Sequence, residues 1–148
     1  MKTWLSILGV FLIAYLVGSW LKPTSMDDAE LIISDCDPSH GKCQLNFDGQ
    51  SVSFAFTGTP SPLTPFGVEL IAKQSMIENA SVSFEMQGMD MGYHQHVLTR
   101  QQDSWSAQLI LPVCSLGRND WIVKLKIKTA EQTFISQFSF VQNQKQSL

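Results

Sequence analysis

Residues 121–128 read WIVKLKIK, and this run decides the fold class. Apolar side chains recur at every second position, with lysines in between. Successive side chains of a β-strand point to opposite faces, so a period of two predicts a strand with one buried face and one solvated face. The buried face would carry Trp121, Val123, Leu125 and Ile127, and the other Ile122, Lys124, Lys126 and Lys128.

The same pattern recurs along the chain. Further strand-like runs are 51–56 (SVSFAF), 68–72 (VELIA), 81–86 (SVSFEM), 105–111 (WSAQLIL) and 133–141 (TFISQFSFV). Turn signals such as Asp48-Gly49 and Glu78-Asn79 separate the runs. Six to eight short strands in about 100 residues predict an all-β fold, an immunoglobulin-like antiparallel β-sandwich.

An apolar segment precedes this region. Residues 4–21 read WLSILGVFLIAYLVGSWL and contain no charge. As a helix they would span roughly 27 Å, close to the hydrocarbon thickness of a bilayer. A cleaved signal peptide is the alternative, but no A-x-A pattern follows the segment. We therefore predict one transmembrane helix as an anchor at 1–22, a tether at 23–34 and the β domain at 35–148.

The cysteines and charges indicate the compartment and the kind of partner. Lys2 and the α-amino group weakly favour a cytoplasmic N-terminus, which places the β domain outside the cytoplasm. There, Cys36 and Cys43 would pair across a short turn; pairing of either with Cys114, or three buried thiols, are the alternatives. The net charge of −3 gives no basic surface for nucleic acid.

One window concentrates metal-binding side chains. Residues 86–96 read MQGMDMGYHQH, in which two glycines indicate a loop. Thioethers and imidazoles are soft to borderline ligands that suit Cu(I). The candidate metal ligands are Met86, Met89, Met91, His94 and His96, with Cys114 as a further candidate. In the competing interpretation the methionines fill core gaps and the histidines are solvated; we interpret His40 as a solvated turn residue.

A family resemblance adds to these predictions. The run Met86-Gln87-Gly88-Met89-Asp90-Met91-Gly92, the step Leu111-Pro112, and Gly117-Arg118 followed by Trp121 resemble YtkA-like and FixH-like domains over about 65–141. The resemblance implies a single-pass protein of the bacterial inner membrane, with an immunoglobulin-like periplasmic domain that handles copper or assists assembly of haem-copper oxidases. It departs from the family at Gln87, where Pro is frequent, and at the two residues between Arg118 and Trp121.

Three functions compete on this sequence. The first is a periplasmic copper-binding accessory protein, a metallochaperone that holds Cu(I) and passes it to an inner-membrane partner such as cytochrome oxidase or a copper chaperone. The alternative is a metal-free interaction or assembly module of a membrane complex. An enzyme is not favoured, because the sequence offers no identifiable Ser-His-Asp set, no Gly-rich phosphate loop and no Cys-x-x-Cys motif.

Overall fold

The computed structural model describes residues 29–47, 49–72, 77–89, 95–114 and 116–142. These residues form strands, turns and bends, and they contain no helix. Accordingly, nothing within the described ranges is an apolar helix of membrane-spanning length. The predicted anchor at 1–22 lies outside the described residues.

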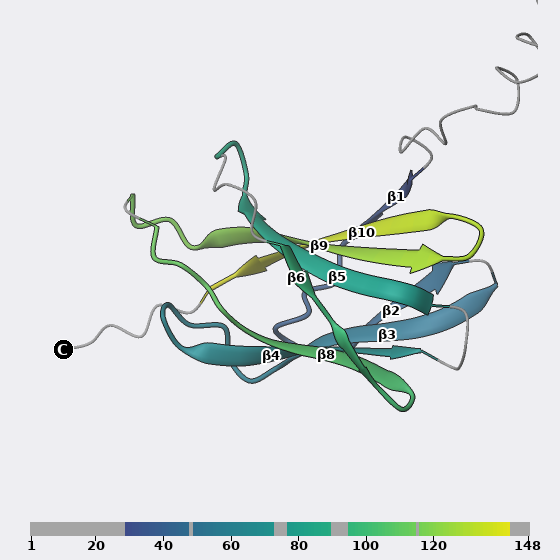
Figure 1. The fold of residues 1–148 in the computed structure, drawn as a ribbon. Coiled ribbons are helices and arrows are strands. Elements are labelled where there is room, and N and C mark those ends of the chain that lie inside the picture. The colour runs from purple at the N-terminus through teal and green to yellow at the C-terminus, as the bar shows by residue number, and fades with distance from the viewer. Residues whose placement is uncertain (1–28, 48, 73–76, 90–94, 115, 143–148) are drawn as a thin grey trace, which may run out of the picture.

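Two five-stranded sheets stack face to face (Figure 1). Sheet A contains, in spatial order, β1 (Ala29–Ser34), β10 (Thr133–Val141), β9 (Asp120–Thr129), β5 (Ile77–Met86) and β6 (Gln95–Val97). Sheet B contains β2 (Cys43–Phe47), β3 (Gln50–Thr57), β4 (Pro65–Ala72), β8 (Ser104–Ile110) and β7 (Thr99–Gln101). The pairing of β1 with β10 is parallel, and the other named pairs are antiparallel. The all-β sandwich predicted from the sequence is confirmed, and this strand order fits an immunoglobulin-like arrangement.

The core lies between the inner faces of the two sheets. Aromatic rings from both sheets meet there: Phe54 of β3 stacks on Phe138 of β10 with ring centroids 5.3 Å apart, and Phe56 meets Phe140 edge to face at 5.0 Å. The predicted face of β9 is also correct, because its four odd-numbered apolar residues are buried. The alternation of apolar and polar residues thus determines which face of these strands is buried in the core.

Six strands fall where the sequence predicts them, and four were not predicted. β1, β2, β6 and β7 have six or fewer residues and lie at sheet edges. β6 and β7, with three residues each, are too short to show a period of two, and β2, although it alternates, has only five residues. β1 occupies the last six residues of the region that we expected to be a tether, so Ala29–Ser34 belong to the β domain. Leu98, which is buried, separates β6 in sheet A from β7 in sheet B.

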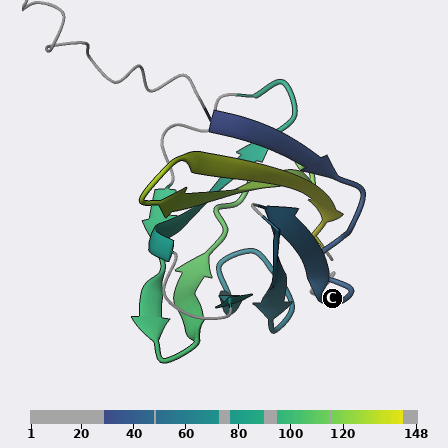
Figure 2. The same cartoon turned by 90° about the vertical axis from the view of Figure 1, so that its right-hand side faces the viewer.

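The two ends of the sandwich differ. At one end, which we call the loop end, connections of seven to nine residues join the strands: 35–42, 58–64, 87–94 and 111–119. At the other, the hairpin end, the connections have two to four residues: 48–49, 73–76, 102–103 and 130–132. β1 runs from the hairpin end toward the loop end, as a view turned by 90° also shows (Figure 2). The predicted metal loop belongs to the loop end.

Candidate functional site at the loop end

The predicted metal loop begins with a tight turn. The backbone N–H of Met89 donates to the carbonyl of Met86 at 3.1 Å, and Gly88 has φ +72°. Positive φ at the third residue of a four-residue turn is typical of type II, which favours glycine there. Met86 is 2% exposed and lies opposite Trp121 on β9, whereas Met89 is partly buried against the core. The turn therefore holds two thioethers close together in sequence and space.

The other predicted ligands do not all join this turn. His96 pairs with Val82 on β5, four residues before Met86, which places its backbone about 13 Å along the strand. Met91 and His94 lie outside the described residues. Among the described residues, no group of three or more His, Cys, Asp and Glu side chains is placed to hold a metal ion.

Cys114 is a free thiol in the connection 111–119. It is 8% exposed, and its carbonyl accepts a hydrogen bond from the N–H of Gly117 at 3.0 Å. The guanidinium of Arg118 lies within electrostatic range of its sulfur. The third cysteine is therefore a shielded thiol at the same end of the sandwich as the methionine turn.

Arg118 forms an ion pair with Asp120 where β9 begins. Its Nε donates to Oδ1 of Asp120 at 2.9 Å, and a second guanidinium nitrogen donates to Oδ2. These hydrogen bonds favour the charged forms, so they raise the pKa of Arg118 and lower the pKa of Asp120. The pair is solvent-exposed in large part, and its main effect is to fix the exit of the loop.

Trp121 and Gln142 fasten this connection to the end of β10. The indole Nε1 of Trp121 donates to Oε1 of Gln142 at 3.1 Å, and the N–H of Gln142 donates to the carbonyl of Asn119 at 2.8 Å. Gln142 is 3% exposed, and its Nε2 has no hydrogen-bond partner within the described ranges. The buried amide of Gln142 thus links the connection 111–119 and the start of β9 to the end of β10.

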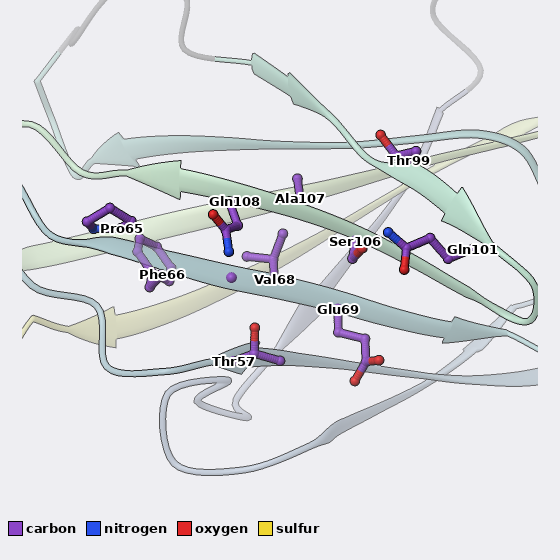
Figure 3. Close-up of a pocket in the computed structure, with 11 residues that line it drawn as sticks. Thr57, Pro65, Phe66, Val68, Glu69, Thr99, Gln101, Ser106, Ala107 and Gln108 are labelled. Carbon is purple, nitrogen blue, oxygen red and sulfur yellow. The ribbon is translucent and has the colours of Figure 1, made fainter.

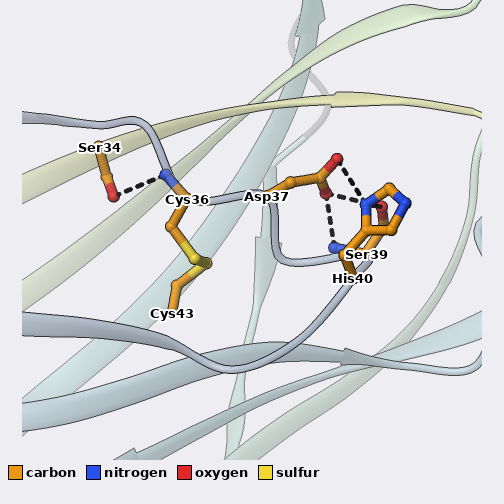
Figure 4. Close-up of a disulfide and its surroundings, with 6 residues drawn as sticks. All are labelled: Ser34, Cys36, Asp37, Ser39, His40 and Cys43. Carbon is orange, nitrogen blue, oxygen red and sulfur yellow. Dashed lines mark hydrogen bonds and ion pairs between the residues drawn. A yellow bond between two sulfur atoms is a disulfide. The ribbon is translucent and has the colours of Figure 1, made fainter.

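The disulfide predicted for Cys36 and Cys43 is present and closes the connection 35–42 (Figure 4). Inside this ring, Oδ1 of Asp37 accepts hydrogen bonds from the N–H and the hydroxyl of Ser39, at 2.8 and 2.6 Å. The same ring positions Pro38, whose carbonyl accepts from the N–H of Phe56 on β3. The bridge therefore attaches the loop to sheet B.

Ser39, His40 and Asp37 form a contact trio that the sequence analysis did not identify. Nδ1 of His40 lies 3.0 Å from Oδ2 of Asp37 and 3.2 Å from the hydroxyl of Ser39. In a hydrolytic triad the serine and the carboxylate contact different ring nitrogens. Here both contact Nδ1, so this arrangement cannot relay a proton from the serine. The signal in the sequence is the spacing Asp-x-Ser-His, which is typical of an Asx-type turn.

Four exposed apolar side chains lie at the loop end, on the connections 58–64 and 111–119 and on the last residue of β8. We call Leu63, Ile110, Val113 and Leu116 the apolar loop patch; each is at least half exposed. The N–H of Leu63 donates to the carbonyl of Leu111 at 3.2 Å, which joins the connection 58–64 to the end of β8. Large contiguous apolar surfaces on a soluble domain mark interaction sites.

Two hollows lie on the part of the surface that the structure describes. A small cleft of about 190 Å³ opens beside the methionine turn, between Gln87 and Asp37, with Asp120 in its wall. A broader groove of about 650 Å³ runs over the outer face of sheet B, where Gly67 leaves room for the side chain of Thr57 (Figure 3). Its lining is spread over four strands and contains one charge, Glu69. The small cleft is the hollow that adjoins the predicted residues.

Comparisons with known proteins identify no family. No family model matches the chain, and neither does any curated protein. A crystal structure of an engineered protein matches with a TM-score of 0.48 at 15% identity, and the match covers 62% of this chain and 20% of that one. The chain thus spans about a fifth of that protein, at a similarity too low to carry an argument. The resemblance to YtkA-like and FixH-like domains stays a prediction.

Proposed function

We propose that this protein is a membrane-anchored, extracytoplasmic interaction module whose apolar loop patch binds the extracytoplasmic portion of an inner-membrane protein complex. The observation that carries the proposal is the patch itself, four large apolar side chains at least half exposed on the end of β8 and on the two connections that meet there. The disulfide supports an oxidising compartment. A haem-copper oxidase is the partner that the family resemblance implies.

The direction of β1 determines which end of the domain carries the tether and which end faces the partner. A tether before Ala29 attaches at the hairpin end, because β1 begins there. The ten-residue strand β9 spans about 33 Å between the two ends. The patch would therefore stand away from the point of attachment, which suits a partner with a sizeable extracytoplasmic domain.

Photo-cross-linking in native membranes tests this proposal. A photoreactive residue at Leu116 is expected to form a discrete adduct with an integral membrane protein, and Leu63→Lys is expected to reduce the yield at least fivefold because it places a charge in the contact. Glu131 in the hairpin-end turn is the matched position, where no adduct is expected. Equal adducts at both positions, or a yield unaffected by Leu63→Lys, would show that the patch is not the contact.

Copper handling is the second candidate, and the sulfur content of the loop end favours it. Met86 and Met89 adjoin in the turn, and the free thiol of Cys114 lies in a connection at the same end. Sulfur ligands select Cu(I). In this candidate Met89, which is the less buried thioether of the turn, would bind first, and the proposed loop residues Met91 and His94 would complete the site.

Titration of the detergent-solubilised chain with Cu(I) tests this second function. Met89→Ala combined with Met91→Ala is expected to weaken Cu(I) binding at least tenfold. Gln87→Ala is the matched control, because it alters the same turn without removing sulfur. An affinity unchanged by the double substitution would refute a copper site in this loop, while leaving the interaction module untouched.

A further inference from the structure

Strand β1 forms an open edge of sheet A. Its six residues pair with β10 on one side, and on the other side none of the described strands continues the sheet. Figure 2 shows β1 as the outermost strand beyond β10. An edge strand presents a row of backbone N–H and C=O groups that another strand can use.

This edge has few of the features that usually prevent strand addition, and Glu30 is the only charged residue of β1. Proteins protect edges with lysine, proline, bulges or very short strands. The sequence AELIIS contains neither lysine nor proline, and its register with β10 is regular over all six residues. On its outer face Leu31 is 55% exposed and Ile33 is 70% exposed. By contrast, β6 and β7 have three residues each, and β2 carries Gln44 and Asn46 outward.

We propose that β1 pairs with β1 of a second copy of this chain, antiparallel and centred on Ile32, so that the two A sheets join into one. In this register Leu31 of each copy faces Ile33 of the other on the outer face, where the two side chains cover each other. On the inner side Ile32 faces Ile32, and Glu30 faces Ser34. Cross-strand apolar pairs of this kind stabilise antiparallel sheets.

The neighbouring registers are less favourable for chemical reasons. Antiparallel pairing centred on Glu30 would place two carboxylates opposite each other, and like charges in that position are destabilising. Centring on Leu31 would oppose Glu30 to Ile32, and centring on Ile33 would oppose Leu31 to Asp35. The cross-strand side-chain pairs therefore favour the Ile32-centred register over these three.

Disulfide trapping of the full-length chain tests the register. On a background of Cys114→Ala, Ile32→Cys is expected to give a covalent dimer as the main species on a non-reducing gel after mild oxidation. Val97→Cys is the control, since Val97 is an apolar residue on the opposite edge of sheet A and is more exposed than Ile32, so exposure alone would favour trapping at Val97. Equal trapping at both positions would overturn the proposal.

A charge at the edge tests the association itself. Ile33→Lys is expected to weaken dimerisation at least tenfold in sedimentation equilibrium of the detergent-solubilised chain, because it places a lysine against Leu31 twice per dimer. Val97→Lys should leave the association unchanged, and urea unfolding of both variants shows that each is folded. A wild-type chain that is monomeric, or a dimer insensitive to Ile33→Lys, would overturn the proposal. The Leu116 cross-link should survive in Ile33→Lys, so failure here is separate from failure of the proposed function.

Discussion

The two ends of the sandwich are built differently although the same strands pass through both. The hairpin end closes with turns of two to four residues, and the loop end uses seven to nine residues for each connection. The short turns show that two to four residues are enough to connect consecutive strands of this fold. The longer connections carry the disulfide, the Arg118–Asp120 pair, the free thiol and the apolar loop patch. Side-chain features beyond the alternating core are therefore concentrated at one end, which is where binding surfaces of sandwich domains lie.

We expect the largest effect from truncating Trp121, the core residue that lies beneath the loop end. Trp121 is 1% exposed and donates to Gln142, so Trp121→Ala should lower the free energy of unfolding by about 3–5 kcal/mol. Ile127→Val, a smaller deletion on the same face nearer the hairpin end, should cost about 1 kcal/mol. Urea unfolding measures both. A loss below about 1 kcal/mol for Trp121→Ala would contradict this packing.

Loss of the disulfide should have the next largest effect. Cys36 and Cys43 are seven residues apart, and the chain-entropy model gives about 2.5 kcal/mol for a ring of this size. Cys36→Ala should therefore unfold at lower urea than the wild type under oxidising conditions. Under reducing conditions the two proteins should unfold together. If the difference persisted after reduction, the effect would come from packing and not from the bridge.

Substitution of two glycines, one at each end of the sandwich, would separate effects on stability from effects on function. Gly88 in the methionine turn has φ +72°, and Gly49 in a hairpin turn has φ +70°, and a Cβ meets no atom within 4 Å at either. Alanine at either position should therefore cost about 1 kcal/mol through backbone strain alone. Thermal unfolding should show equal losses, whereas only Gly88→Ala should alter Cu(I) affinity. Equal functional effects would remove the distinction between the ends.

The smallest effect concerns pH. The hydrogen bonds from Arg118 lower the pKa of Asp120 from its usual value near 3.8. A carboxyl whose pKa is lower in the folded state stabilises the protein above its unfolded pKa, and this contribution is lost as the pH falls through the folded pKa. Stability should therefore decline below about pH 4, and Asp120→Asn should make this decline slightly shallower. An unchanged pH profile in Asp120→Asn would show that the pair contributes nothing to folding.

The sequence predicted the fold where strands are long and half buried. Residues 121–128 and 133–141 alternate cleanly because one face packs on the core and the other meets water. β1 was missed because AELIIS has no alternation, and its partner β10 lies a hundred residues away in the chain. A local sequence pattern carries no information about a parallel pairing between two segments that lie so far apart in the chain.

The candidate site was predictable in part. Pairing of Cys36 with Cys43 followed from the short turn between them, and the turn at Gly88 followed from the glycine. The separation of His96 from Met86 was not predictable, because it depends on how the chain returns along β5 after the loop. The apolar loop patch was missed as well, since the connection 58–64 meets the end of β8 only through the hydrogen bond from Leu63 to Leu111, which joins distant parts of the chain.

The parallel pairing of β1 with β10 has a mechanical consequence. A pull on the chain at Ala29, directed away from the hairpin end, runs along the axis of β1 and loads its hydrogen bonds to β10 in shear, all together and not one after another. Beyond β1, the covalent bridge from Cys36 to Cys43 would pass any remaining load to β2 in the other sheet. If the predicted anchor precedes β1, this geometry would resist a pulling force at the point of attachment.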